Sequence, residues 1–294
     1  MFGLLAAFFW GSTDFLSRFP SRKIGPAYST AYVQLFSLIG FSAYVLLTGP
    51  PTVEFLSKGS SYLVIDLFVG MLNVSGLMLL YRSFTTGNMS LTAPIASSFP
   101  IFTILLGYVF LGQVIGAAKG IAIAIVISGV ILSGVNLSST KNNPSKIEKT
   151  KTKRLSNSVV SAFAASLFFG GAYLGLNLGL GYFGSVLSIL FFRLGAVLFS
   201  FLFLFVTMKK LVLPTGGAWK WLLTMAILDS LGFASLTLGY LSSGNSPAVV
   251  TTLSSLLGAV TTILATVIYK DKLTRVQILG IVILFSGVVI LLNV

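Results

Sequence analysis

The chain has 294 residues and a net charge of +13, and 55% of its residues are hydrophobic while only 9% are charged, against about 25% charged residues in ordinary soluble proteins. The apolar residues occur in long runs rather than in amphipathic alternation, which excludes a water-soluble globule. The chain contains no cysteine and no histidine, which excludes disulfides, thiol nucleophiles, Cys/His metal sites and histidine proton relays.

The apolar runs predict an all-α integral membrane protein with ten transmembrane helices. A bilayer core of about 30 Å requires roughly 20 apolar residues per helix. The first run begins the chain, and we expect a retained helix there rather than a signal peptide. The predicted spans are 1–19, 27–48, 62–83, 89–111, 116–137, 157–178, 185–207, 218–241, 246–268 and 275–293.

The fifth and sixth spans are separated by a polar, basic segment, which predicts a solvated linker over residues 138–156. The halves on either side, 1–137 and 157–294, resemble one another. Such self-similarity indicates duplication. The aligned pairs include 85–99 with 242–256, 10–14 with 169–173, 127–132 with 285–290, and Gln34 with Arg193.

The two halves must cross the membrane in opposite senses, because each contains an odd number of spans. They therefore form two inverted five-helix repeats, a layout found in many secondary transporters. Of the 19 Lys and Arg residues, all except Lys58, Lys119 and Arg193 fall on one side. Because Lys and Arg are retained in the cytoplasm, this bias predicts a plasma-membrane protein with a cytoplasmic linker and both termini outside. The basic charge then mainly sets the orientation of the chain in the membrane, and it also attracts anionic membrane lipid. We expect no nucleic-acid partner.

The chain resembles the EamA type of the drug/metabolite transporter superfamily over essentially its whole length. The resemblance is carried by FFWGSTDFLSR, by NMSLTAPIASSFPIFTILLGYVFLGQ and by NSPAVVTTLSSLLGAVTTILATVIYKDKL. It implies a central cavity lined by the first, third, fourth, sixth, eighth and ninth spans, with the fifth and tenth outermost. Relatives commonly carry a glutamate after the fourth and ninth spans, where this chain has Gln113 and Asp271.

Charged side chains inside the spans are the first candidates for function, because such groups usually face a bundle interior or a cavity. Trp10, Asp14 and Arg18 share one face of the first span. Asp14 therefore has two interpretations: a local ion pair with Arg18, or a cavity carboxylate that binds a cationic group or a proton.

Asp229 lies in the middle of the eighth span without a basic neighbour in sequence. It must be protonated, paired with another helix or exposed to water, so both a transport role and a structural role are open. Arg193 must also find a partner, and we favour a structural role for it because its span is not expected to line the cavity.

Neutral polar residues suggest a substrate site shared between the halves. Pro94 and Pro100 free backbone carbonyls in the fourth span, which serine hydroxyls can satisfy. Trp10 and Tyr173 combine an apolar body with a polar tip. The remaining candidates for substrate binding or coupling are Asn73, Asn177, Ser97, Ser98, Ser254 and Ser255.

The favoured function is secondary active transport of a small metabolite by alternating access, with protons as the candidate coupling ion through Asp14 or Asp229. The alternative is an ion channel or divalent-cation carrier, for which two carboxylates could supply oxygen ligands. An enzyme is not expected, and no cofactor or metal is predicted. We expect a monomer rather than a homodimer.

Overall fold

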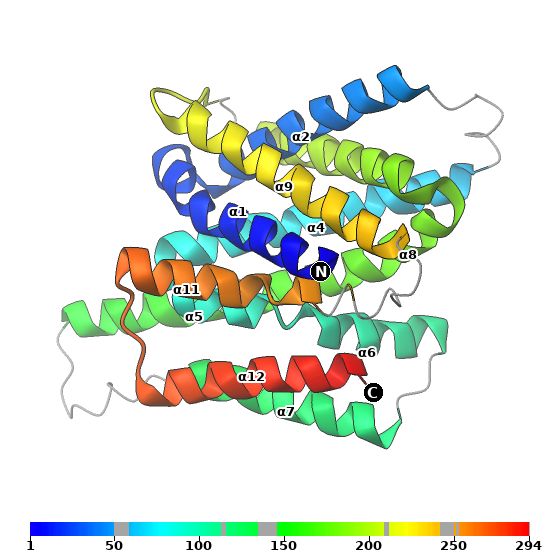
Figure 1. The fold of residues 1–294 in the computed structure, drawn as a ribbon. Helices are drawn as coiled ribbons and strands as arrows, with labels where there is room; N and C mark the ends of the chain where they lie inside the picture. Colours follow the sequence, from blue (N-terminus) through cyan, green and yellow to red (C-terminus); the bar gives the residue numbers. More distant parts are fainter. Residues whose placement is uncertain are drawn as a thin grey trace.

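In the computed structural model the described residues form helices and no strand, as the composition predicts (Figure 1). The structure describes residues 1–49, 59–112, 116–134, 146–208, 212–241, 250 and 253–293. The helices are α1 (Phe2–Ile24), α2 (Pro26–Thr48), α4 (Ser60–Thr86), α5 (Met89–Ala96), α6 (Phe99–Leu111), α7 (Ala117–Gly134), α8 (Lys146–Met208), α9 (Ala218–Leu241), α11 (Leu257–Tyr269) and α12 (Arg275–Asn293).

Over the described residues these helices match the predicted spans with one difference in continuity; residues 246–249 and 251–252 of the ninth predicted span lie outside the described residues. The span predicted at 89–111 is divided into α5 and α6 at Ser97 and Ser98. The spans predicted at 157–178 and 185–207 are two helices that share the label α8 and meet at Gly184, where the backbone is non-helical with φ 70° and ψ −179°. This conformation is accessible essentially only to glycine.

Several helices are long and apolar enough to cross a membrane. Within the described residues, five segments meet the length and composition of a full span, and three shorter apolar segments correspond to the predicted spans in α7, α11 and α12. The helices outside these two groups are α1 and α9, which carry Asp14 and Asp229. Large apolar side chains such as Phe8, Leu47 and Phe110 are exposed on the outside of the bundle, where lipid would cover them. The protein is a multi-pass membrane protein.

The predicted linker is helical in its second part. Residues 138–145 lie outside the described residues, but α8 already begins at Lys146. The segment 146–156 is rich in lysine and other good helix formers, so it continues the following helix instead of interrupting it.

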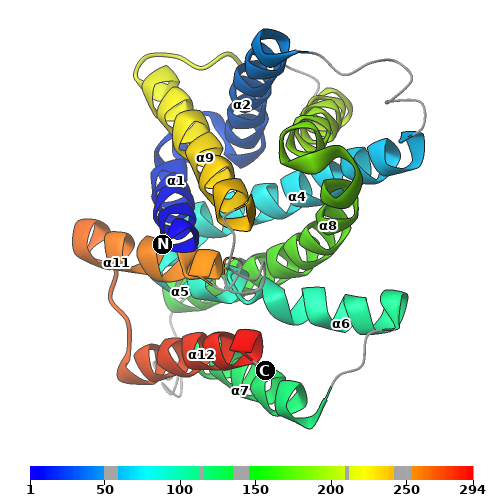
Figure 2. The same cartoon turned by 45° about the vertical axis from the view of Figure 1, so that its right-hand side comes forward.

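The two halves are interleaved around the centre of the bundle (Figures 1 and 2). α1 packs along α9, α5 packs along α11, and α4 packs along α8, so each of these contacts joins the first half to the second. α7 and α12 pack on each other at one edge of the bundle. Their peripheral position matches the outermost fifth and tenth spans that the family resemblance implied.

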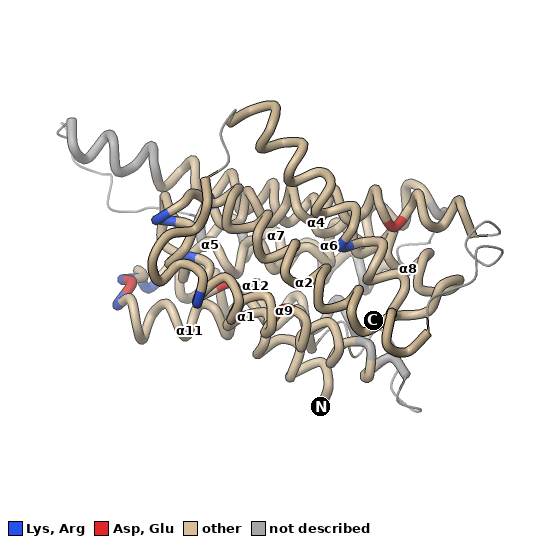
Figure 3. The backbone as a smooth tube through the Cα atoms, turned by 90° about the horizontal axis from the view of Figure 1, so that it is seen from above, with Lys and Arg blue, Asp and Glu red and all other residues tan. Residues whose placement is uncertain are grey.

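Most of the Lys and Arg residues that the structure describes gather at one end of the bundle (Figure 3). We call this the basic end; it contains the C-terminal ends of α1 and α4 and the start of α12, with Arg18, Arg22, Lys23, Arg82, Lys270, Lys272 and Arg275. The clustering agrees with the charge bias in the sequence. The placement of both termini outside the cell stays a prediction.

Candidate functional site

A small cavity lies where the two halves meet. Its volume is about 50 Å³. Its walls come from α1, α4, the α5–α6 break, the first part of α8, α9 and α11, which are the six spans expected from the family resemblance. The lining residues are Trp10, Thr13, Asp14, Asn73, Leu77, Leu80, Tyr81, Ala93, Ala96, Ser97, Phe99, Phe169, Tyr173, Asp229, Phe233 and Leu257.

Asp14 is a wall residue of this cavity and is not paired with Arg18. The side chain is 7% exposed. Arg18, one turn further along α1, instead faces Asp271 at 3.8 Å and lies 4.4 Å above the ring of Tyr269. The interpretation of Asp14 as half of a local ion pair is therefore wrong, because the arginine is held by the end of α11. Asp14 is left as a carboxyl without an ion pair among the described residues.

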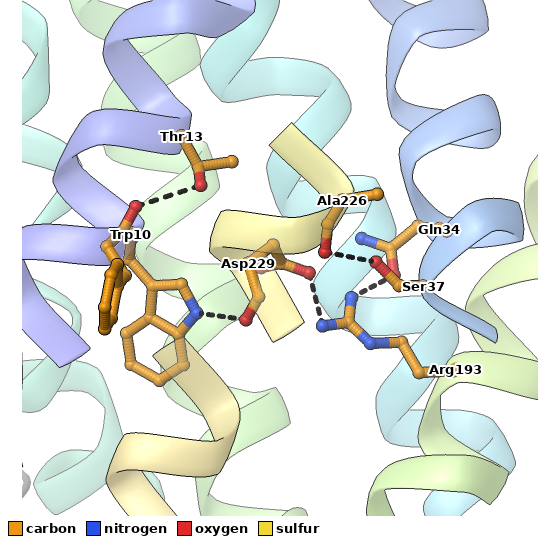
Figure 4. Close-up of polar contacts among 8 residues, drawn as sticks. Trp10, Thr13, Gln34, Ser37, Arg193, Ala226 and Asp229 are labelled. Carbon is orange, nitrogen blue, oxygen red and sulfur yellow. Dashed lines mark hydrogen bonds and ion pairs between the residues drawn. The ribbon is translucent and has the colours of Figure 1, made fainter. Parts of the chain in front are cut away.

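Asp229 is held in a buried network that joins three helices (Figure 4). The Arg193 guanidinium donates to the Asp229 carboxylate and to Gln34 Oε1. Ser37 Oγ donates to the carbonyl oxygen of Ala226 at 3.4 Å. This pairing agrees with the structural role favoured for Arg193. For Asp229 the sequence left protonation, pairing with another helix or exposure to water, and the structure shows pairing with another helix.

The partners in this network are also related by the internal repeat. Gln34 and Arg193 are aligned positions of the two halves, and they contact each other directly. Residues that lie near a pseudo-two-fold axis meet their own repeat counterparts. Gln34 is neutral whereas Arg193 is charged, so the network is asymmetric. Both of its charged residues, Arg193 and Asp229, belong to the second half.

Aromatic side chains form much of the cavity wall. The Trp10 indole nitrogen donates to the carbonyl oxygen of Asp229 at 3.3 Å, and its ring meets Phe233 edge-on with centroids 4.9 Å apart. Tyr173 stacks on Phe99 at 4.8 Å. These rings line the same cavity as the Asp14 carboxyl, and aromatic rings attract cations.

The α5–α6 break is stabilised by side-chain hydrogen bonds, but its serines do not bond the carbonyls of Ser90 and Ala96 that the two prolines free. Ser97 Oγ donates to the carbonyl of Ala93 at 2.9 Å, and Ser98 Oγ donates to that of Ile95 at 2.7 Å. Pro94 cannot donate to the carbonyl of Ser90, four residues earlier. Thr262 of α11 donates to that oxygen at 3.3 Å, so a residue of the second half supplies the hydrogen bond that Pro94 removes from the first.

The predicted site residues separate into two groups. Six of them line the cavity: Trp10, Asp14, Asn73, Ser97, Tyr173 and Asp229. Ser98, Ser254, Ser255, Arg18 and Arg193 do not line it, although all three of these serines are buried. The side chain of Asn177 and the whole of Gln113 lie outside the described residues.

Sequence reasoning missed the apolar part of the wall, since phenylalanines were expected mainly to face lipid or fill the bundle. Three of the missed residues lie one or two helical turns from a predicted polar one. Phe169 precedes Tyr173 by four residues, Phe233 follows Asp229 by four, and Tyr81 follows Asn73 by eight. Extending each polar position along its helical face would have found them.

Comparison with known proteins supports the fold and the family. The model of the EamA-like transporter family matches residues 1–135 and again residues 156–293. No curated protein sequence matches the chain. A solved crystal structure of a protein shares the fold with a TM-score of 0.66 at 14% identity, over 98% of this chain and 94% of that chain. Because the family model covers both repeats, the chain belongs to the EamA-like transporter family, and it is a membrane transporter of the drug/metabolite transporter superfamily.

Proposed function

We propose that the protein is a secondary transporter for a small amphipathic solute with a cationic group, which it moves by alternating access through the central cavity. The observation that carries this proposal is the unpaired Asp14 carboxyl in an aromatic-lined cavity between the repeats. A carboxylate attracts the charged head of such a solute, while Trp10, Tyr173 and Phe233 suit its apolar body.

Solute binding requires the cavity to expand. Its volume is about 50 Å³, whereas a cavity that binds a molecule as small as benzene has about 150 Å³. The present conformation is therefore contracted, and a solute would bind to a state in which the repeats have moved apart. A ligand shifts such an equilibrium only through its different affinity for the two states, which is the basis of alternating access.

The alternative of a divalent-cation carrier has less support from the cavity. A hard divalent cation takes about six to eight oxygen ligands. Of the two carboxylates at the cavity, Asp229 is already bound to Arg193. One free carboxyl surrounded by aromatic rings favours an organic cation.

The test is a thermal-shift screen of cationic, zwitterionic and anionic metabolites against the purified protein, followed by uptake into proteoliposomes. A ligand that binds only the folded state raises its melting temperature. We expect hits among the cationic or zwitterionic amines, with both the shift and the uptake lost in Asp14→Asn.

The matched control is Thr224→Val, which removes a polar group that lies on the exposed side of α9. This variant should keep both the shift and the uptake. If only anionic solutes bind, or if Asp14→Asn transports like the unmodified protein, the assignment of Asp14 as the solute-binding carboxylate is wrong.

A further inference from the structure

Asp66 is a buried carboxyl that the central cavity does not use. It lies on α4, and both it and Ser188 of α8 have 0% exposure. The Ser188 hydroxyl lies beside the Asp66 carboxyl. Neither Asp66 oxygen, nor the Ser188 hydroxyl, completes a hydrogen bond within the part of the chain that the structure describes. A buried ionised carboxylate without a partner is strongly destabilised by the loss of its hydration.

The carboxyl is pressed against the backbone of α8 next to its interruption. A Cβ atom at Gly179 would overlap the Asp66 carboxyl, so only glycine permits this contact. Gly184, where the helical conformation of α8 is broken, lies between Gly179 and Ser188 in sequence. Asp66 therefore lies beside the end of the first of the two helices that meet at Gly184.

This position is close to the end of the bundle opposite the basic end. Arg82, near the C-terminal end of α4, is at the basic end, and Asp66 is only six residues from the start of the same helix at Ser60. Six residues span about 9 Å of helix. In this part of the bundle, Tyr62 of α4 and Tyr182 of α8 stack with their ring centroids 4.9 Å apart. A small opening between α4 and α8 would therefore expose the carboxyl to water.

Within the part of the chain that the structure describes, the charged and ionisable groups around Asp66 offer it no counter-ion; Glu54 and Lys58, which precede α4, lie outside that part. Arg193, further along α8, is bound to Asp229 and Gln34. α5 carries no ionisable side chain, and the charged residues of α1 lie in the half of that helix directed toward the basic end. The other described ionisable side chains of the packed helices near this level are tyrosines, namely Tyr62 on α4, Tyr182 on α8, and the exposed Tyr44 on α2 and Tyr108 on α6.

We propose that Asp66 is a proton-binding site on the side of the protein opposite the basic end, separate from the central cavity. The carboxyl holds its proton while α4 and α8 are closed around it and transfers the proton to water when they separate. This inference rests on the proposed transport function and assigns proton coupling to a different residue from Asp14 and Asp229.

The first test is independent of any solute. Infrared spectra of the reconstituted full-length protein distinguish a protonated carboxyl from a carboxylate by their separate carbonyl bands. At neutral pH, the difference between the unmodified protein and Asp66→Asn should show loss of a carboxylic-acid band. Loss of a carboxylate band instead would overturn the proposal. Ser188→Ala, which keeps the carboxyl, should shift the carboxylic-acid band without removing it, and Asp271→Asn should leave it unchanged.

The second test uses proteoliposomes and a solute that the protein transports. Asp66→Asn should lose accumulation driven by a pH gradient while it still exchanges solute across the membrane at equal pH. Accumulation by Asp66→Asn equal to that of the unmodified protein would overturn the proposal, as would accumulation driven by a sodium gradient without a pH gradient. If the unmodified protein transports no solute, the transport function fails, while the infrared band still decides whether Asp66 holds a proton.

Discussion

At the scale of single residues, Asp14 and Asp229 differ in their contacts although both line the cavity. Asp229 neutralises the fully buried Arg193, whereas Asp14 has no ion pair within the described residues. Removal of one partner from a buried ion pair leaves an uncompensated charge, which costs about 3–5 kcal/mol. We therefore expect Asp229→Asn to lower the free energy of unfolding by that amount, as measured by denaturation in detergent.

Asp14→Asn is the matched control for this experiment, because it neutralises a cavity carboxyl without leaving a cation unpaired. It should cost little or no stability. The double variant Arg193→Met with Asp229→Leu should recover much of the loss, since a buried pair replaced by apolar residues leaves no charge behind. Equal destabilisation by Asp14→Asn and Asp229→Asn would show that the ion pair does not determine stability.

The sequence was sufficient to select most of these residues but not to assign their roles. A charge in the middle of an apolar run is conspicuous, and this is how Asp14, Arg193 and Asp229 were found. Asp66 is near the end of the predicted span 62–83, where a sequence does not separate an interfacial aspartate from a buried one. Pairing depends on tertiary contacts, so the sequence favoured the nearby Arg18 for Asp14, although Arg18 contacts the distant Asp271.

At the scale of elements, prolines and glycines determined where the helices break. The prolines in 89–111 correctly drew attention to Ser97 and Ser98, where α5 ends and α6 begins. The two spans predicted at 157–178 and 185–207 are separate helices that meet at Gly184, but the sequence did not predict that the first of them would begin in the linker, at Lys146. It also gave no sign that Thr262 satisfies the carbonyl freed by Pro94, since that contact joins residues far apart in the chain.

Thr262→Val tests this contact between α5 and α11. Valine has nearly the same shape but cannot donate to the carbonyl of Ser90, so one buried acceptor loses its partner. We expect a loss of about 1–3 kcal/mol in the free energy of unfolding. The control is Thr224→Val, because Thr224 donates only to the carbonyl of Lys220 in its own exposed helical turn. If both variants lose the same stability, the contact between the repeats contributes nothing specific.

At the scale of the whole molecule, the two repeats are joined by polar contacts near the basic end. Asp271 accepts hydrogen bonds from the backbone nitrogen and the hydroxyl of Ser90, each at 3.3 Å, and also faces Arg18. Thr266 Oγ1 donates to Ser90 Oγ at 3.1 Å. Since Arg18 and Ser90 belong to the first repeat while Thr266 and Asp271 belong to the second, these contacts close the basic end in the present conformation.

A reversible cross-link at this position tests whether transport requires the basic end to open. The chain contains no cysteine, so Ser90→Cys combined with Thr266→Cys introduces a single pair of thiols at side chains already in contact. Mild oxidation should form a disulfide and abolish transport into proteoliposomes, and a reductant should restore it. Each single variant, treated in the same way, should remain active. If the cross-linked protein transports at the rate of the reduced protein, the repeats do not separate at the basic end, and alternating access through this cavity is wrong.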